Sequence, residues 1–241
     1  MGYGMMPMLL AADNEVDFSI HHLLAYQFMG QTVYITTSHV CMLIIIVCIM
    51  IFALAARRKM LHADEIPTGF QNAVEFIVET LQGFVNSSMG RHGKKYMNYV
   101  GTLFFFVFLS NISGLFGLRP PTADYGTTFS LALITFVMIQ YNNIKYNKIG
   151  AFTGLFQPLW FLFPINLIGE IATPVSMSLR LFGNVMAGTV MMALYYGLLP
   201  VFAKLGIPAA LHIYFDLFSG AIQAYVFCML TMVFVTDKIE G

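Results

Sequence analysis

Long apolar runs, rarely interrupted by a charge, constrain this chain more than any other feature. The run MLIIIVCIMIF at residues 42–52 is uniformly apolar, and further long apolar segments follow it. Of the 241 residues, 58% are hydrophobic and only 10% are charged, whereas a soluble domain carries about 25% charged residues. Too few polar side chains remain to cover a surface that faces water. The sequence therefore predicts an all-α protein that crosses a membrane several times.

Five segments are expected to cross the membrane, and one further segment is expected to lie on its surface. Residues 67–86 place apolar side chains at helical spacing between polar ones, which predicts an amphipathic helix on the cytoplasmic side. Residues 1–37 are expected to be an external N-terminal segment of the same single membrane domain, 1–241. The predicted spans are residues 38–56, 96–117, 127–144, 166–197 and 208–236.

The last two predicted spans are too long to stand upright in a bilayer. As straight helices they measure about 48 Å and about 43 Å, against a hydrocarbon core of about 30 Å. Excess length of this kind is accommodated by tilting or bending, and Pro174 and Gly183 provide places to bend. We therefore expect a long tilted helical hairpin near the C-terminus.

Basic residues collect at one set of segment ends. Nine of the twelve Lys and Arg residues fall on one side when these ends are placed together: Arg57, Arg58, Lys59, Arg91, Lys94, Lys95, Lys145, Lys148 and Lys238. Arg119 and Lys204 fall on the other side, and Arg180 lies within a span. Because cytoplasmic loops are enriched in Lys and Arg, the C-terminus is expected inside and the N-terminus outside, which requires an odd number of spans.

The two ends of the chain bear on which membrane holds it. The N-terminal run MMPMLLAA lacks a basic region before it and leads into acidic residues, so it is a poor signal peptide. The missing presequence and the short polar C-terminus favour a bacterial plasma (inner) membrane over an organelle. Cys41, Cys48 and Cys228 are too few and too poorly placed for a disulfide framework and are expected to fill apolar space.

Arg180 is the residue that most needs an explanation. It lies within residues 173–200, which contain no other charged side chain. An arginine cannot lose its charge by giving up a proton, and holding it at mid-bilayer costs from about 3 to more than 10 kcal/mol. We therefore expect Arg180 to face a partner, a water-filled cavity, or both. On the same helical face, one turn further on, lies Asn184.

A second polar stripe lies on the last span, where His212, Asp216 and Gln223 share one face. Glu170 precedes Arg180 by two to three helical turns. Charged residues within a membrane are functional candidates by default, but structural roles remain open for all of these. Arg180 could form an ion pair with Glu170 or Asp216, and Asp216 could be a capping carboxylate. His212 could be interfacial, while Asn184 and Gln223 could join helices by hydrogen bonds.

At SLRLFGNVMAG, residues 178–188, the chain resembles subunit a of the rotary F-type ATP synthases, the stator channel of their membrane sector. The resemblance covers most of the chain in the family's order. It rests on PTGFQNAVEFIVETLQ, LFFFVFLSNISGLFG, PTADYGTTFSLAL, PINLIGEIATPVSMSLRLFGN and GAIQAYVFCMLTMVF. The LRLFGN block followed by QAYVF is the most specific part of the match.

The resemblance implies a role for each polar position. Arg180 matches the family's essential arginine, which faces a ring of c subunits, each with one carboxyl that takes up an ion from one half-channel and releases it into the other. Asn184 matches an asparagine one turn on, and Gln223 a glutamine of the last helix near the arginine. Asp216 falls where the family has a titratable or polar residue. Glu170 occupies a position where acidic residues are common beside the channel.

One position departs from the family. Thr189 stands where several members have an acidic residue or histidine, and threonine cannot titrate. Asp216 is then expected to carry more of that half-channel's relay, with Glu170 and ordered water assisting. The coupling ion, H⁺ or Na⁺, is left open, because in this family the ring carboxyl site decides it.

The resemblance also implies partners, namely the c-subunit ring, the b-subunit peripheral stalk, the rest of the ATP synthase and membrane lipid, with no nucleic acid. No GxxxxGK[ST] loop and no nucleophile–base set is evident, so we expect a non-catalytic subunit without cofactor or metal. A secondary transporter is the main alternative, but inverted repeats or paired broken helices are not visible. A purely structural subunit would give no reason to keep Arg180 and Asp216 in hydrocarbon.

Overall fold

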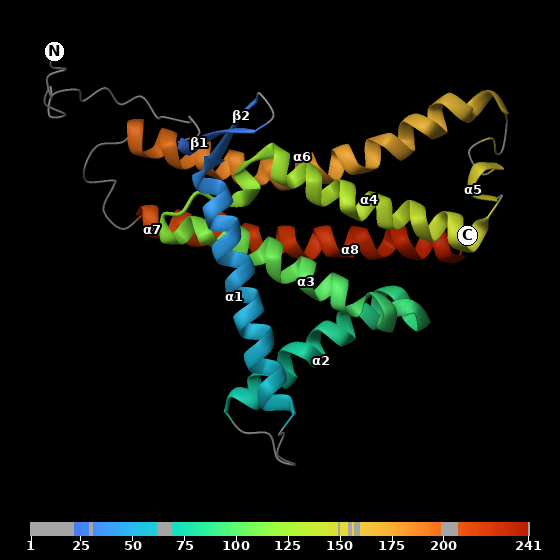
Figure 1. Ribbon diagram of the computed structural model, residues 1–241, viewed down its shortest axis with the longest axis horizontal. Coiled ribbons are helices and arrows are strands. Elements are labelled where there is room, and N and C mark those ends of the chain that lie inside the picture. Colours follow the sequence, from blue (N-terminus) through green and yellow to red (C-terminus); the bar gives the residue numbers. More distant parts are fainter. Residues whose placement is uncertain are drawn as a thin grey trace, which may run out of the picture.

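Four helices form the interior of the chain: α3 (Gly93–Ile112), α4 (Tyr125–Asn147), α6 (Phe163–Leu198) and α8 (Ser219–Glu240). In this computed structural model α4 lies beside α6 and α8, and α3 lies beside α8 (Figure 1). The structure describes residues 22–28, 31–61, 69–148, 150–153, 156, 160–198 and 207–240. Residues 1–21 of the expected external segment therefore lie outside the described residues.

Apolar side chains from all four helices meet in one core. Its fully buried members include Val107 of α3, Ala132 of α4, Leu181 of α6, and Phe227 and Met232 of α8. Lipid tails are as apolar as these side chains, so burial between helices gains little from leaving water. The bundle is instead held by close packing and dispersion contacts, together with hydrogen bonds between helices.

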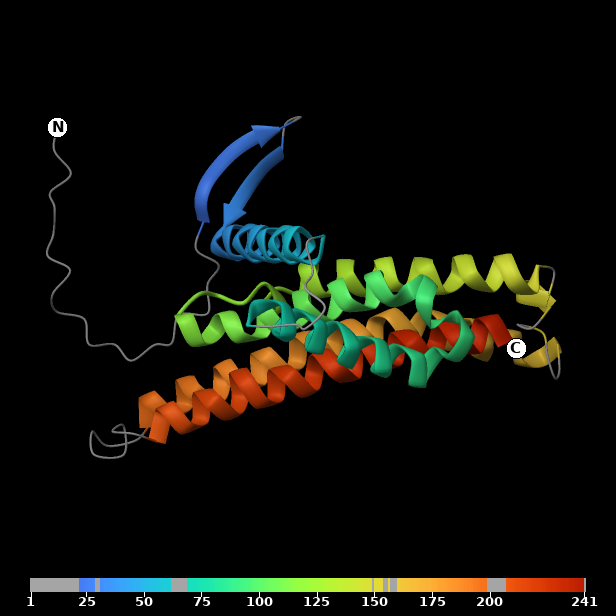
Figure 2. The ribbon, with the colours of Figure 1, turned by 90° about the horizontal axis from the view of Figure 1, so that it is seen from below.

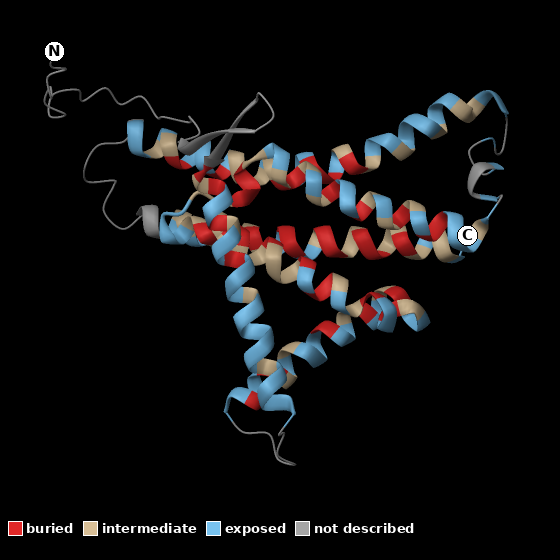
Figure 3. Cartoon of the chain, in the orientation of Figure 1, coloured by how far each residue is buried: buried red, intermediate tan, exposed pale blue. Residues whose placement is uncertain are grey.

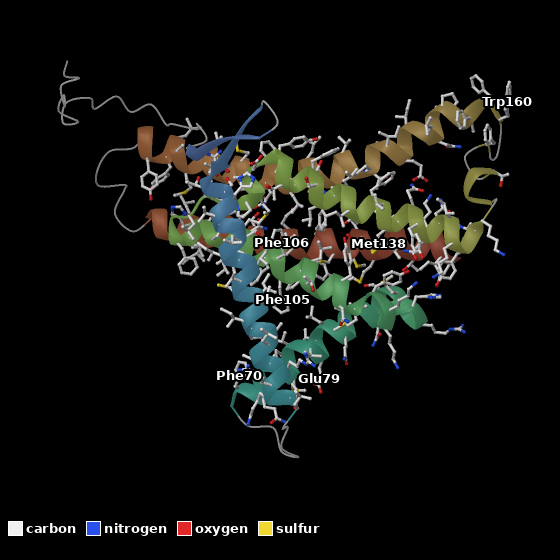
Figure 4. The ribbon with its side chains drawn as sticks, viewed as in Figure 1. Phe70, Glu79, Phe105, Phe106, Met138 and Trp160 are labelled. Atoms are coloured by element: carbon white, nitrogen blue, oxygen red, sulfur yellow. The ribbon has the colours of Figure 1, made fainter. Side chains whose placement is uncertain are left out.

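Helix α1 (Thr37–Met60) is the least buried of the long helices. Of its side chains only Ser38, Cys41 and Ile45 are buried, and Figure 3 shows it almost entirely in the exposed colour. It contacts the bundle through Phe52, whose ring centroid lies 6.2 Å from that of Phe70 and 6.2 Å from that of Phe105 (Figure 4). A uniformly apolar helix exposed in this way is what a lipid-facing span requires.

Helix α2 (Phe70–Met89) is amphipathic. It buries Val74, Leu81, Val85 and Met89 at helical spacing, and packs against α3 and α8. It ends at Gly90, whose φ of +53° is readily adopted only by glycine. The chain then turns through a short 3₁₀ helix, Gly90–His92, directly into α3.

Shorter elements connect the long ones. The described N-terminal part forms an antiparallel hairpin of β1 (His22–Phe28) and β2 (Gln31–Thr36). The 3₁₀ helices Ser113–Phe116 and Pro121–Ala123 join α3 to α4, and α5 (Gly150–Thr153) with the 3₁₀ helix Trp160–Leu162 precedes α6. Before α8 come α7 (Ile207–His212) and a single π-helical stretch, Ile213–Phe218.

The predicted all-α, multi-pass architecture with a long C-terminal helical pair is confirmed. Helix α6 has 36 residues, which corresponds to about 54 Å. It bends along its length in Figure 1, and Figure 2 shows α6 and α8 side by side. Pro174 lies inside α6, where it removes one backbone hydrogen bond and so permits a bend.

The predicted count of five spans needs correction. By length and composition, four helical segments of the described residues could cross a membrane: Thr37–Met60, Phe70–Phe116, Trp160–Gly197 and Ala210–Glu240. The predicted span 127–144 is helical, as part of α4, but does not meet this criterion. The C-terminal third of this span carries Gln140, Asn142 and Asn143, which lower its mean hydropathy.

The polar side chains of α4 lie where other helices provide partners. The Tyr96 hydroxyl of α3 donates to Asn142 Oδ1, and Asn142 Nδ2 donates to the Met138 carbonyl of its own helix at 2.8 Å. Asn147 Nδ2 donates to the Lys238 carbonyl of α8 at 3.0 Å. A helix can therefore be this polar and still pack inside a membrane bundle, because its amides are satisfied there.

Helices α3 and α8 approach each other closely at Gly220. A Cβ added to Gly220 would lie 2.8 Å from the Cβ of Asn111, which is closer than such atoms can stand. Asn111 is buried and uses its amide on both sides: Nδ2 donates to the Gly220 carbonyl at 3.2 Å, and Oδ1 accepts from Thr122 Oγ1 at 2.9 Å. Only glycine permits this contact, which fixes the start of α8 against α3.

We expect Gly220→Ala to destabilise the protein by about 1–3 kcal/mol, the usual effect of overpacking a close contact. Thermal unfolding of the purified chain in detergent measures it. Gly83→Ala is the matched control, because a Cβ there meets nothing within 4 Å and alanine suits a helix interior. Equal midpoints for the two variants would contradict the close contact.

Candidate functional site

Arg180 lies on an exposed face of α6. Within the described part of the chain its guanidinium makes no hydrogen bond or ion pair. Its neighbours along this face are small and exposed: Ser176 and Gly183 lie about one turn to either side, and Ala187 lies two turns further on. The sequence left open an ion pair between Arg180 and Glu170 or Asp216, and both carboxylates are engaged elsewhere. The guanidinium therefore stands open to a partner from outside the chain.

Glu170 joins three helices at one end of the bundle. One carboxylate oxygen accepts a hydrogen bond from Gln140 Nε2 of α4 at 2.6 Å, and the other pairs with the ammonium group of Lys238 of α8. The Glu170 and Lys238 side chains are 24% and 30% exposed. Glu170 precedes Arg180 by ten residues, about 15 Å along α6. Its partner is therefore Lys238 and not Arg180.

His212 and Asp216 form a pair at the opposite end of the bundle. His212 Nδ1 lies 2.8 Å from Asp216 Oδ2, and the side chains are 36% and 23% exposed. Asp216 sits in the π-helical stretch Ile213–Phe218, and such stretches occur frequently at functional sites. The Asp216 carboxyl group packs beside Gly114, where a Cβ would stand at an ordinary contact distance of 3.4 Å from the carboxyl carbon.

Asn184 and Ser219 connect α6 to α8 between these two ends. Ser219 Oγ donates to Asn184 Oδ1 at 2.7 Å. One turn beyond Ser219 lies Gln223, which is only 7% exposed and whose Nε2 has no hydrogen-bond partner among the described residues. Leaving such a donor buried without a partner is costly.

Two of the residues that the sequence singled out are thus brought together, His212 with Asp216. The others are distributed along the seam between α6 and α8. Lys238, Ser219 and Gly114 were not among the candidates. Lys238 was counted only as a flanking charge, and nothing in the sequence places it beside Glu170. Thr189 is exposed and its hydroxyl bonds the Val185 carbonyl of its own helix at 2.9 Å.

The described residues contain no group of three or more His, Cys, Asp or Glu side chains that could hold a metal ion. What they contain is an unpaired cation on an exposed helix face, with separate polar clusters toward either end of the same helix. Together with the long apolar helices, this defines a multi-pass membrane protein built to handle charge inside the bilayer.

Comparison with known proteins identifies the family. The model of the ATP synthase A chain family matches residues 39–236. A curated relative from Propionigenium modestum, "ATP synthase subunit a, sodium ion specific", is 44% identical over 67% of this chain and 62% of its own length. The ATP synthase subunit a of Priestia megaterium is 36% identical over 73% of this chain and 80% of its own length. The chain belongs to the ATP synthase A chain family.

We expect the Glu170–Lys238 pair to contribute about 1 kcal/mol or less, because both side chains are partly exposed. Lys238→Gln should lower the thermal unfolding midpoint by about 2–4 °C, and Glu170→Gln in that background should add little, since the pair is already broken. Lys94→Gln, an exposed lysine on α3, is the control. Fully additive shifts would show that the two side chains do not interact.

Proposed function

We propose that this chain is the stator ion-channel subunit of a rotary ATP synthase. It carries ions to and from carboxyl groups on a c-subunit ring, and Arg180 prevents a direct leak between the two paths. The observation that carries the proposal is the exposed, unpaired guanidinium of Arg180 on an apolar helix face. A permanent charge in that position is stabilised when carboxylates of another subunit pass it. The chain itself is non-catalytic, and nucleotide chemistry belongs to other subunits.

The face of α6 around Arg180 suits a ring of helices moving past it. Exposed large apolar residues lie toward both ends of the same helix, with the small residues Ser176, Gly183 and Ala187 around the arginine. Small side chains let helix backbones approach closely in membranes. The exposed apolar side chains of α6 are Ile165, Leu167, Ile168, Ile171, Leu179, Val190, Met191, Leu194 and Tyr196.

In this proposal the two half-channels correspond to the polar clusters on either side of Arg180. One cluster surrounds Glu170, about 15 Å before Arg180 along α6. The other surrounds Asp216, whose neighbour Phe215 packs against Gly188, about 12 Å after Arg180. Ions entering by one cluster would reach a ring carboxyl on one side of the arginine and leave by the other. Asn184 and Gln223 line the seam between them.

The Glu170 cluster marks the cytoplasmic end in this proposal. Asn147 at the end of α4 bonds the Lys238 carbonyl near the end of α8, and Lys95 at the start of α3 lies 5.8 Å from the ring centre of Tyr146. Basic ends of three helices therefore meet, as expected of a cytoplasmic face. The C-terminus then lies on the cytoplasmic side of a bacterial inner membrane.

The rest of the assembly follows from the family. The partners are the c-subunit ring, the b-subunit peripheral stalk and the other subunits of the ATP synthase. The coupling ion is H⁺ or Na⁺. The sodium-specific relative makes Na⁺ worth testing directly, and ATP synthesis by the reconstituted complex with and without Na⁺ decides between them.

Arg180→Ala should abolish ATP synthesis driven by an ion gradient in the assembled complex, because nothing then stops ions from passing directly between the half-channels. Arg180→Lys should retain little activity, since lysine can deprotonate when it is desolvated. Synthesis and passive ion flux in proteoliposomes measure both effects. Arg91→Ala, an exposed arginine before α3, is the control. Retained synthesis in Arg180→Ala would refute the proposed function.

Asp216→Asn should slow ion translocation more than Thr189→Val does. The carboxylate is placed against His212 and Gly114, whereas the Thr189 hydroxyl bonds only to its own helix within the described residues. A positioned proton-transfer group contributes roughly a hundredfold to ten-thousandfold to a rate, so a loss of about a hundredfold or more is expected. Passive flux through the membrane sector measures the difference, and equal rates would count against a special role for Asp216.

A further inference from the structure

The hydrogen bond from Ser219 to Asn184 has a particular place in the molecule. It joins the start of α8 to α6, and its acceptor Asn184 lies one helical turn from Arg180. Ser219 is the first residue of α8, directly after the π-helical stretch that carries Asp216. Its hydroxyl thus stands between the Asp216 cluster and the arginine.

The position of this hydroxyl is fixed from two sides. Gly220, the next residue, is pressed against Asn111 of α3 and bonded to it through its carbonyl. On the α6 side, a Cβ added to Gly188 would meet Phe215 at 3.5 Å, an ordinary packing distance. Helix α8 is therefore wedged between α3 and α6 at its start, so that Ser219 has little freedom to leave Asn184.

The hydrogen bond from Ser219 fixes the orientation of the Asn184 side-chain amide, and with it the direction of the amide N–H donors. Asn184 Oδ1 accepts from Ser219, so the Nδ2 group, with two N–H donors, lies on the other side of the planar amide. Within the described residues Nδ2 has no acceptor. Asn184 is half-buried, between the exposed Gly183 and Ala187 on the face of Arg180. The two N–H groups of Asn184 Nδ2 are therefore available to an acceptor that approaches this face of α6.

We propose that Ser219 is a positioning residue, whose hydroxyl holds the Asn184 amide so that its N–H donors meet the ring carboxylate beside Arg180. The proposal rests on the function proposed above, in which ring carboxylates pass Arg180. The arriving carboxylate would accept hydrogen bonds from the amide as well as from the guanidinium, and preorganised donors stabilise a charge more than donors that must first reorient. Ser219 acts through Asn184 and does not touch the carboxylate.

The test uses the whole ATP synthase, reconstituted in liposomes, with ATP synthesis driven by an imposed ion gradient. Ser219→Ala should slow synthesis roughly three- to tenfold, as expected for the loss of one hydrogen bond. Ser219→Thr keeps a hydroxyl and should restore most of the rate, and the isosteric Ser219→Cys, a weaker donor, should fall between them. In the Asn184→Ala background, Ser219→Ala should cause no further loss.

Other outcomes overturn the proposal. The first is a wild-type rate of synthesis for Ser219→Ala. The second is a Ser219→Thr rate as low as that of Ser219→Ala in complexes that contain the full ring. The third is an additive loss when Ser219→Ala is combined with Asn184→Ala. Ser130→Ala is the matched control, since that exposed hydroxyl bonds the Gly126 carbonyl of its own helix. Arg180→Ala is measured in parallel: if it still synthesises ATP, the proposed function fails, and if it does not, a normal Ser219→Ala rate refutes the positioning role alone.

Discussion

The cost of holding a charge away from water governs this structure. Glu170 is paired with Lys238 and bonded by Gln140, and Asp216 is paired with His212. Each of these carboxylates lies toward an end of α6 or α8, partly exposed, where solvation is cheaper. Arg180 alone, among the charged residues of the described parts of α6 and α8 away from their ends, has no partner in the chain. Its guanidinium is therefore open to a group from outside the chain, on the exposed face of α6.

Polar groups also explain why the bundle has a specific arrangement. Between apolar helices in lipid, packing alone distinguishes one arrangement from another only weakly, because hydrocarbon side chains fit many neighbours. The amides of Asn111, Asn142 and Asn147 each bond to another helix or receive a bond from one. A sliding or rotation of α8 would break the bonds of Asn111 and Asn147, and a movement of α4 against α3 would break that of Asn142. The polar residues that reduce the apolar character of α4 thus define the relative placement of three helices.

Much of this architecture was predictable from the sequence, because its physical cause is local. Apolar runs of membrane length give helices at α1, α3, α6 and α8, and the 3.6-residue spacing of Phe70, Val74 and Val85 gives the amphipathic α2. The span count was wrong at α4, since hydropathy records the polar amides but not the partners that satisfy them. The isolation of Arg180 was also predictable, as its own helix offers no carboxylate one turn away.

What the sequence could not provide were contacts between residues far apart in the chain. The partner of Glu170 is Lys238, 68 positions away, and a flanking lysine carries no local sign of such a role. The π-helical stretch at Ile213–Phe218 likewise has no hydrophobic period of its own, so residues 208–236 read as one regular helix.

The start of α8 brings these constraints together. A π-helical stretch widens the helix locally and turns the residues after it relative to those before, so Asp216 and Ser219 need not face the direction that a regular helix would give them. Asp216 faces the backbone of Gly114, while Ser219 faces Asn184. Because Gly220 has no side chain, Asn111 of α3 approaches the start of α8 closely, and this contact limits the movement of both Asp216 and Ser219. One irregular turn and the close contact at Gly220 therefore direct two neighbouring polar side chains toward different partners. The proposed roles require this arrangement: Asp216 takes part in the ion path, while Ser219 positions the Asn184 amide where ions are transferred.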